Sequence, residues 1–129
     1  MKLNYDCFRE VFLFIEEKLI WEDDLKYHYL QLYAFEQNIT KYSKAEIAYA
    51  LKMGIEAGLI DGVILDSDAG IFDIRCFGLT FEGHQFLDTV RENKIWQKTK
   101  SALKAVSGAS LSVITSIAKD FLIDYLKTL

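Results

Sequence analysis

Cysteine and histidine side chains are the most reactive groups in this 129-residue chain, and it has two of each. Cys76 and His84 lie eight positions apart across an expected strand-to-helix turn, but a four-ligand zinc site would also need distant carboxylates. A cysteine nucleophile needs a neighbouring base and an orienting group, and the sequence places neither beside Cys7 or Cys76. We therefore predict no metal and no cofactor, with two reduced, buried thiols in a cytoplasmic protein.

Carboxylate pairs are the next candidates for chemistry, because two close carboxylates can share a proton. Glu16 with Glu17 and Asp23 with Asp24 are adjacent in sequence, so their side chains point in different directions. The chain also has neither a GxxxxGK[ST] nor a GxGxxG phosphate-binding loop. These patterns predict that the protein is not an enzyme.

The first elements follow from apolar periodicity. Apolar residues from Phe8 to Leu19 recur every three or four positions, which predicts a helix over residues 4–18 with Asn4 or Asp6 as its cap. The next stretch, LKYHYLQLY at residues 25–33, alternates aromatic and other residues. Alternation favours a strand and leaves a helix as the alternative. Residues 20–42 contain no clear polar helix of the kind that opens a helix-turn-helix.

The middle of the chain has the clearest boundaries. Ser43 and Glu46 form a capping box that starts a helix, and Gly58 is placed to end it in a left-handed conformation. Gly54 inside this helix indicates a close contact or a bend. Two short β-like runs then flank the turn at residues 67–70, and Thr80 can cap the following helix, whose buried stripe is expected to be Phe86, Leu87 and Val90.

Charge divides the chain unevenly. Residues 1–92 carry 9 basic and 17 acidic side chains, a net charge of −8, whereas residues 93–108 carry four lysines and no acid. Residues 109–129 balance to zero, so the whole chain has a net charge of −4. An acidic body must concentrate its few cations on one face in order to bind nucleic acid.

The C-terminal region contains two further helical patterns. Ile95, Trp96, Thr99, Leu103 and Val106 mark a basic amphipathic helix, and small residues at 107–110 interrupt it. Apolar residues then recur every three or four positions to Leu129, which predicts a helix with a long apolar seam. Lys119, Asp120 and Asp124 interrupt that seam, so a membrane-spanning helix is disfavoured.

Four segments together resemble one family: MKLNYDCFREVFLFIEE, YSKAEIAYALKMGIEAGLI, LTFEGHQFLDTVRENKIWQKTK and the apolar tail. The family is catalogued as domain of unknown function twenty-five thirteen and occurs in phages, prophages and their bacterial hosts. The resemblance implies a small winged-helix-like protein with a helical tail and no established activity. This chain departs from the family pattern after Tyr49, where Ala50 stands in place of a histidine, so no role for that histidine carries over.

The sequence thus predicts an α+β fold with two parts. Residues 1–92 are expected to form a winged-helix-like domain, in the order helix, strand, turn, strand, helix around residues 56–87. Residues 93–129 are expected to form an amphipathic helical tail, with a basic helix followed by the helix that carries the apolar seam.

We expect this protein to be a non-catalytic interaction module, of a phage or prophage accessory type, that contacts an unidentified protein and also self-associates. Tyr and Trp are effective interface anchors, and core packing is the alternative role for each of them. The expected partner-binding residues are Trp21, Tyr27, Tyr29 and Tyr33. The expected homo-oligomer contacts lie on the last helix at Leu111, Ile114, Ile117, Phe121 and Tyr125, although the same seam can also pack on its own domain.

Two alternatives remain open. A winged-helix DNA-binding regulator would use Lys44, Lys52, Arg75, Lys94 and Lys98. The acidic residues of the wing and the lack of Asn and Gln in the middle helix weigh against base readout and phosphate anchoring. A membrane-associated accessory protein that works through residues 109–129 is the weaker alternative.

Overall fold

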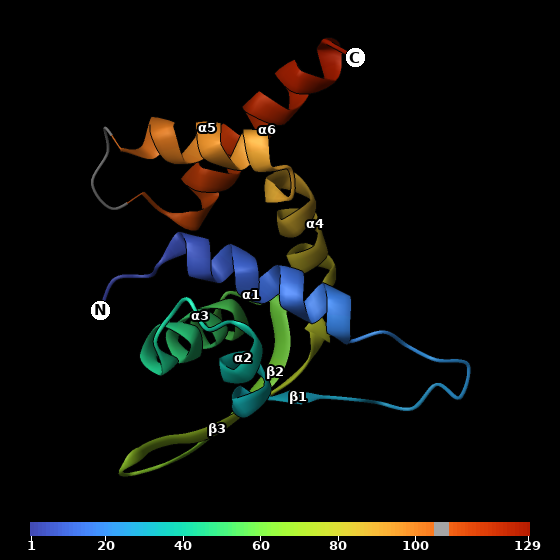
Figure 1. Cartoon of the computed structure of the whole chain (residues 1–129), viewed down its shortest axis with the longest axis vertical. Coiled ribbons are helices and arrows are strands. Elements are labelled where there is room, and N and C mark those ends of the chain that lie inside the picture. The colour runs from blue at the N-terminus through green and yellow to red at the C-terminus, as the bar shows by residue number, and fades with distance from the viewer. Residues whose placement is uncertain (105–108) are drawn as a thin grey trace. The chain divides into compact units, whose positions relative to one another are not determined.

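The computed structural model describes residues 1–104 and 109–129, and within them it is an α+β structure with six helices and one three-stranded antiparallel sheet (Figure 1). Val106, Ser107 and Gly108, which the sequence assigned to the basic helix and the break after it, lie outside these residues. The elements are α1 (Tyr5–Lys18), β1 (Leu30–Gln31), α2 (Leu32–Asn38), α3 (Lys44–Glu56), β2 (Ile60–Ser67), β3 (Gly70–Leu79), α4 (Phe81–Val90), α5 (Asn93–Leu103) and α6 (Leu111–Lys127).

The described chain divides into two compact units, Met1–His84 and Gln85–Leu129, which are treated separately below. The division falls inside α4, whereas the sequence placed a boundary between residues 92 and 93. The first unit therefore holds the whole sheet and the first turn of α4.

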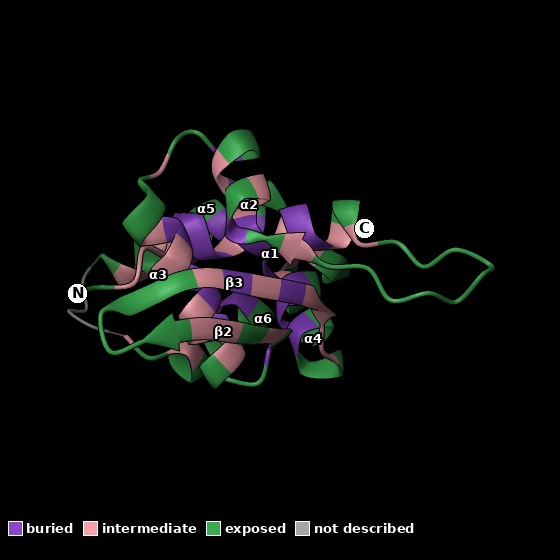
Figure 2. Cartoon of the chain, turned by 90° about the horizontal axis from the view of Figure 1, so that it is seen from below, coloured by how far each residue is buried: buried purple, intermediate pink, exposed green. Residues whose placement is uncertain are grey.

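Helix α1 supplies most of the aromatic core of the first unit. The Asn4 side chain accepts a hydrogen bond from the Cys7 amide and so caps the helix, as the sequence predicted. Phe8 and Phe12 are fully buried, with ring centroids 4.6 Å apart. Phe14, on the next turn, packs against Phe35 of α2 at 5.2 Å. The purple segments of α1, α3 and β3 in Figure 2 mark this core.

The sheet has the strand order β1-β3-β2, so β3 lies in the middle. Strands β2 and β3 form the hairpin that the sequence predicted, but both strands are longer than the short runs expected. Their pairing extends from Ile60 and Leu79 to Ser67 and Gly70 at the turn. Strand β1 adds only two residues to the other edge of β3, where Leu30 faces Cys76. The hairpin is therefore the main body of the sheet.

Helix α3 begins and ends where the sequence predicted. Ser43 and Glu46 form the reciprocal capping box. At the other end Gly58 has a φ of +74°, and the amides of Gly58 and Leu59 bond back to the carbonyls of Ile55 and Gly54. This is the Schellman arrangement, which suits glycine because a side chain disfavours positive φ.

Gly54 makes the close contact that its position indicated. A Cβ atom at Gly54 would overlap the side chain of Ile60 on β2. The glycine thus lets α3 approach the hairpin closely, and that contact explains why it is tolerated inside a helix.

The predicted strand over residues 25–33 is wrong for most of its length. Only Leu30 and Gln31 pair with β3, and Leu25 to Tyr29 lie outside any strand. Tyr33 belongs to α2, a seven-residue helix that the sequence did not predict. The alternation of tyrosines does not come from one buried sheet face, because Tyr27, Tyr29 and Tyr33 are all exposed.

The start of α4 is fixed to the end of α3 across the base of the hairpin. The Thr80 hydroxyl accepts a hydrogen bond from the Gly83 amide, as predicted for a cap, and donates to the Gly58 carbonyl at 2.6 Å. The Thr80 amide donates to the Leu59 carbonyl, which a Cβ atom at Gly83 would overlap. We call this set of contacts the hairpin clasp. The predicted stripe of α4 is also confirmed, since Phe86, Leu87 and Val90 are buried.

The second unit is built mainly from α5 and α6, which pack against each other. Ile95, Trp96 and Thr99 of α5 are buried, in agreement with the predicted stripe. In α6, Ile114 and Ala118 are buried, and Ser110 caps the helix by accepting from the Val113 amide. One face of the N-terminal half of α6 is therefore already covered.

Candidate protein-interaction surface

The connection from α1 to β1 is the most exposed apolar segment of the first unit. We call residues 19–29 the aromatic arm; Figure 1 shows it as a long loop that extends away from α1 and β1, and Figure 2 shows that its residues are exposed. Trp21 is 63% exposed, Tyr27 81% and Tyr29 47%. Ile20 and Leu25 are also exposed. Five large apolar or aromatic side chains thus face solvent within ten residues.

Local interactions hold the arm in its bent course. The Leu25 amide donates to the Glu22 carbonyl at 3.0 Å, and the Lys26 amide donates to the Asp24 carboxylate at 3.1 Å. Leu25 has a φ of +56°, an uncommon value for a bulky residue. Strain of this kind is often found where a loop has a binding role.

Aromatic contacts occur at two places in the arm: one joins its two sides, and the other lies at its base. Trp21 and Tyr27 meet edge to face, with ring centroids 5.9 Å apart and an interplanar angle of 89°. At the base, the Arg75 guanidinium lies 5.2 Å from the centre of the Tyr29 ring, and Phe77 lies beside the same ring at 5.8 Å. The structure therefore brings Trp21 and Tyr27 together, whereas Tyr29 lies at the base of the arm. Tyr33 lies apart from them, on α2, and is 67% exposed.

A groove of about 230 Å³ lies beneath the arm, within the first unit. We call it the arm groove. Trp21 and Tyr27 line it from the arm, and Glu16 and Asp61 add carboxylates from α1 and β2. The remaining lining residues are Ile15, Leu19, Phe77, Gly78, Leu79 and His84. Sequence reasoning did not find Glu16, Asp61 or Phe77 as groove residues, because they come from three different elements.

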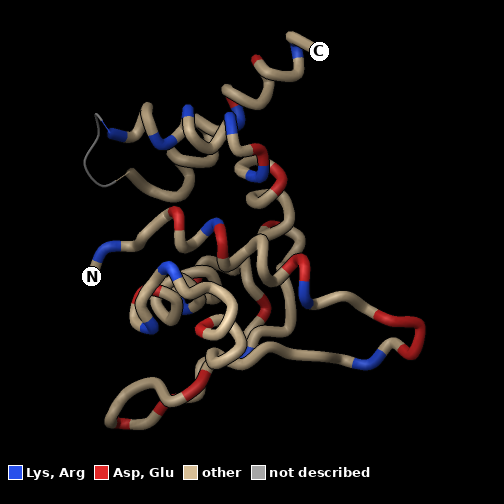
Figure 3. Tube along the Cα trace, viewed as in Figure 1, with Lys and Arg blue, Asp and Glu red and all other residues tan. Residues whose placement is uncertain are grey.

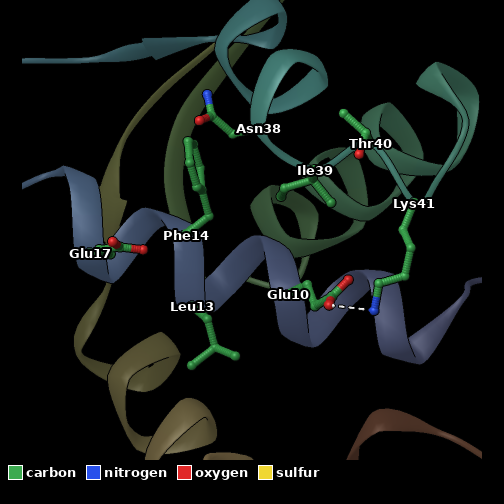
Figure 4. Close-up of a pocket in the computed structure, with 8 residues that line it drawn as sticks. All are labelled: Glu10, Leu13, Phe14, Glu17, Asn38, Ile39, Thr40 and Lys41. Atoms are coloured by element: carbon green, nitrogen blue, oxygen red, sulfur yellow. Dashed lines mark hydrogen bonds and ion pairs between the residues drawn. The ribbon is translucent and has the colours of Figure 1, made fainter.

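A second cavity, of about 330 Å³, lies between α1 and the segment that joins α2 to α3 (Figure 4). Leu13, Phe14 and Ile39 give it an apolar lining. At one end Lys41 Nζ lies 3.0 Å from Glu10 Oε1, as the dashed line in Figure 4 marks. This ion pair bridges the two sides of the cavity, so the lysine that lines the cavity is already paired with a carboxylate.

Glu10 also acts on its neighbours electrostatically. Burial, together with a hydrogen bond to the Glu10 carboxylate, raises the pKa of Tyr42. Burial first, and then the charges of Glu46 and Glu10, raise the pKa of Cys7 to about 12.

Burial also raises the pKa of Cys76, the second thiol, to about 12. Both thiols are therefore protonated at neutral pH, which is the opposite of what a nucleophile or a metal ligand requires.

The acidic and thiol groups do not gather into a metal site. Among the described residues, no group of three His, Cys, Asp or Glu side chains is arranged to hold a metal ion. Cys7 and Cys76 are both free and buried. His84 lines the arm groove and is exposed.

The cations expected to contact DNA differ in their exposure and in whether they already have a partner within the chain. Lys44 is exposed at the start of α3, whereas Lys52 is paired with Glu56 one turn away and Arg75 lies over Tyr29. Lys94 and Lys98 are exposed on α5, in the second unit. Of the three first-unit cations expected to contact DNA, Lys52 and Arg75 are thus engaged within the chain.

The residues of α6 that were expected to form oligomer contacts differ in how far they are buried. Ile114 is fully buried, whereas Leu111, Ile117, Phe121 and Tyr125 are half-buried. Further apolar residues on the same helix are more exposed: Val113 at 43%, Ile123 at 48% and Leu126 at 56%. The C-terminal half of α6 therefore presents most of the uncovered apolar surface of the second unit. Of the helices that the structure describes, none combines the length and apolarity needed to span a bilayer.

Comparison with known proteins places the chain in a family. An uncharacterised protein of Haemophilus influenzae (strain ATCC 51907 / DSM 11121 / KW20 / Rd) is 26% identical over 120 residues, which cover 92% of this chain and 93% of the relative. No solved structure matches the chain. Residues 2–110 match the family described as "Hypothetical protein (DUF2513)". That match spans most of the chain, and the protein therefore belongs to the DUF2513 family, the family that its sequence segments resembled.

Proposed function

We propose that this protein is a non-catalytic interaction module of the phage or prophage accessory type, in which the aromatic arm binds a protein partner. The single observation that carries the proposal is the exposure of Trp21 and Tyr27 on an ordered, bent loop. Aromatic side chains lose little conformational entropy on binding and bury large areas, so they commonly dominate interface energies.

The scaffold of this module is winged-helix-like. The element order α1, β1, α2, α3, β2, β3 and the sheet order β1-β3-β2 support that assignment. In this reading the β2–β3 hairpin is the wing and α3 is the helix that precedes it. The arm is then an extended connection between the first helix and the first strand, and it carries the proposed binding surface.

Self-association through α6 is the second part of the proposal. Ile114 and Ala118 are already buried, so the contacts are assigned to the half-buried and exposed apolar residues of α6. Phe121 and Tyr125 continue the stripe of Ile114 and Ala118, whereas Ile123 and Leu126 lie on the other faces of the helix. Apolar surface of this kind favours a second copy of the helix.

The test of the arm compares pull-downs from cells that carry the gene. The double variant Trp21→Ala/Tyr27→Ala should lose the partner that the wild-type protein captures. Phe81→Ala is the matched control, because Phe81 is 71% exposed but does not line the arm groove. Equal capture by the wild type and the arm variant would remove the arm from the proposal.

The test of self-association is the molar mass in solution, measured by light scattering. The wild type should be a dimer or larger, and Ile123→Glu/Leu126→Glu should be a folded monomer. These substitutions are preferable to removing α6, because removal would also take away the helix that packs against α5. A monomeric wild type would exclude this part.

A winged-helix DNA-binding regulator is the alternative function, and the exposed Lys44 on α3 favours it. Figure 3 marks acidic residues along the β2–β3 hairpin, where phosphate would have to approach. If the protein bound DNA through its cations, affinity for random duplex would fall steeply between low and moderate salt. Absence of binding at low salt would remove this alternative.

A further inference from the structure

The arm groove combines aromatic walls with carboxylates. The Trp21 and Tyr27 rings are perpendicular and in edge contact, so they form two sides of a corner. Phe77 lines the same groove from β3. Ring faces carry the negative end of the aromatic quadrupole, and they attract a cation that lies within about 6 Å of the ring centre.

The charges around the groove also favour a cation. Glu16 and Asp61 line it, and no lysine or arginine is among the described residues that do so. Residues 16–29 as a whole hold five carboxylates and two lysines. Figure 3 shows acidic residues at the outer end of the arm. An anionic ligand such as a phosphate would be repelled here.

The chain already uses this kind of contact beside the groove. The guanidinium of Arg75 lies 5.2 Å from the centre of the Tyr29 ring, at the base of the same arm. Tyr29 is thus occupied by a cation from β3. Trp21 and Tyr27, farther along the arm, provide similar ring faces on a more exposed surface.

We propose that the arm groove is a binding site for an arginine side chain of a protein partner. This deepens the proposed function and depends on it, since it states which chemistry the arm recognises. A volume of about 230 Å³ suits one long side chain rather than a folded element. Arginine fits better than lysine, because a planar guanidinium stacks on Trp21 and can also donate two parallel hydrogen bonds to a carboxylate.

The direct test is an NMR titration of the full-length protein with acetyl-Gly-Arg-Gly-amide. The Trp21 indole N–H and the amides of Glu16 and Asp61 should shift in a saturable way. The neutral citrulline peptide has the same shape without the charge, and it should bind about fivefold more weakly or worse. Equal affinity for the arginine and citrulline peptides would overturn the inference.

Variants of the groove locate the site. Trp21→Leu and Asp61→Asn should each weaken arginine-peptide binding by about threefold or more, because one removes a ring face and the other a carboxylate. Phe81→Ala should leave binding unchanged. Thermal melting of each variant identifies any that fail to fold, and unchanged binding in a folded Trp21→Leu variant would place the arginine elsewhere.

Tetramethylammonium chloride separates a side-chain site from a site for a free small cation. It has no N–H donor, so it should bind more weakly than the arginine peptide; equal or tighter binding would contradict the arginine assignment.

Different results would contradict the proposed function and the arginine site. If the arm variant loses its partner but the arginine and citrulline peptides bind alike, the arm is an interface and the arginine site is wrong. If the peptide binds as expected but the arm variant keeps its partner, the proposed function is wrong and the cation site stands.

Discussion

Two aromatic groups in the first unit, close in sequence, have opposite environments. Phe8, Phe12 and Phe35 are at most 1% exposed, whereas Trp21 and Tyr27 are more than 60% exposed. The buried group consists of phenylalanines, and the exposed group consists of residues that carry a polar N–H or O–H. The aromatic residues of the first unit therefore lie both in the core and on the surface.

The difference shows why apolar composition alone does not locate a core. A phenylalanine exposed on the arm would have no polar group in contact with water, whereas Tyr and Trp present a polar edge together with a large apolar face. The arm therefore presents polar groups to water together with exposed apolar ring surface. Folding stability should depend on the first group and binding on the second.

The largest expected effect is in the buried group. Phe35→Ala should lower the free energy of unfolding by about 3 to 5 kcal/mol, because it empties a fully buried site against Phe14. Tyr33→Ala is the matched control two positions earlier on α2, and it should change stability by about 0.5 kcal/mol or less. Urea denaturation followed by circular dichroism measures both. Equal losses would break the distinction between the two groups.

Gly83→Ala should have the next largest effect. The added Cβ would overlap the Leu59 carbonyl in the hairpin clasp, and this oxygen accepts the Thr80 hydrogen bond. Overpacking against backbone costs about 1 to 3 kcal/mol. Thermal unfolding should give a lower Tm for Gly83→Ala than for Glu82→Ala, a change at the exposed position beside it. A Tm equal to that of the control would show that the clasp can relax.

The buried thiol of Cys76 should make the stability of the core depend on pH. Since burial raises the pKa of Cys76 to about 12 from an unfolded value of 9.0, the unfolded chain loses this proton first as the pH rises. Stability is therefore unaffected by this group below about pH 9 and decreases between about pH 9 and pH 12. Urea titrations of the wild type and Cys76→Ala across this range measure the difference, which should shrink as the pH rises. At pH 8, iodoacetamide should label Cys76 only after unfolding.

The smallest expected stability change is in the arm. Trp21→Ala/Tyr27→Ala should lower the free energy of unfolding by about 0.5 kcal/mol or less, because both rings are mainly solvated and contact each other. The same variant should lose partner binding completely. A large stability loss would mean that the arm is part of the fold rather than an addition to it.

The sequence predicted the parts of this fold that carry local chemical signals. Ser43 and Glu46 mark the start of α3, Gly58 marks its end, and Thr80 marks the start of α4, and each does so through its own hydrogen bonds to nearby backbone. Such signals do not depend on the rest of the chain. The β2–β3 hairpin was predictable for the same reason, from its turn at residues 67–70.

The sequence predictions were wrong where tertiary contacts, rather than local signals, determine the structure. Helix α2 has no side-chain cap at Gln31 and is only seven residues long, so nothing local marks its start. The alternating tyrosines of residues 25–33 resembled a strand, yet only Leu30 and Gln31 have β3 beside them to pair with. The arm groove was not predictable at all, because Glu16, Asp61 and Phe77 meet only after folding. The burial of Ile114 and Ala118 was likewise not predictable, because a periodic apolar pattern does not show which of its residues are covered after folding.

The aromatic arm has one more consequence, which concerns proteolysis. Its peptide bonds lie in an exposed loop, and Trp21, Leu25 and Tyr27 are side chains that chymotrypsin accepts on the N-terminal side of the cleaved bond. A single cut there would separate α1 from the rest of the chain covalently. The two fragments would remain together, because α1 is packed on α3 and β3 through Phe8, Phe12 and their neighbours. The nicked protein should therefore migrate as one species in a native gel and as two in a denaturing gel, and a bound partner should protect the bond.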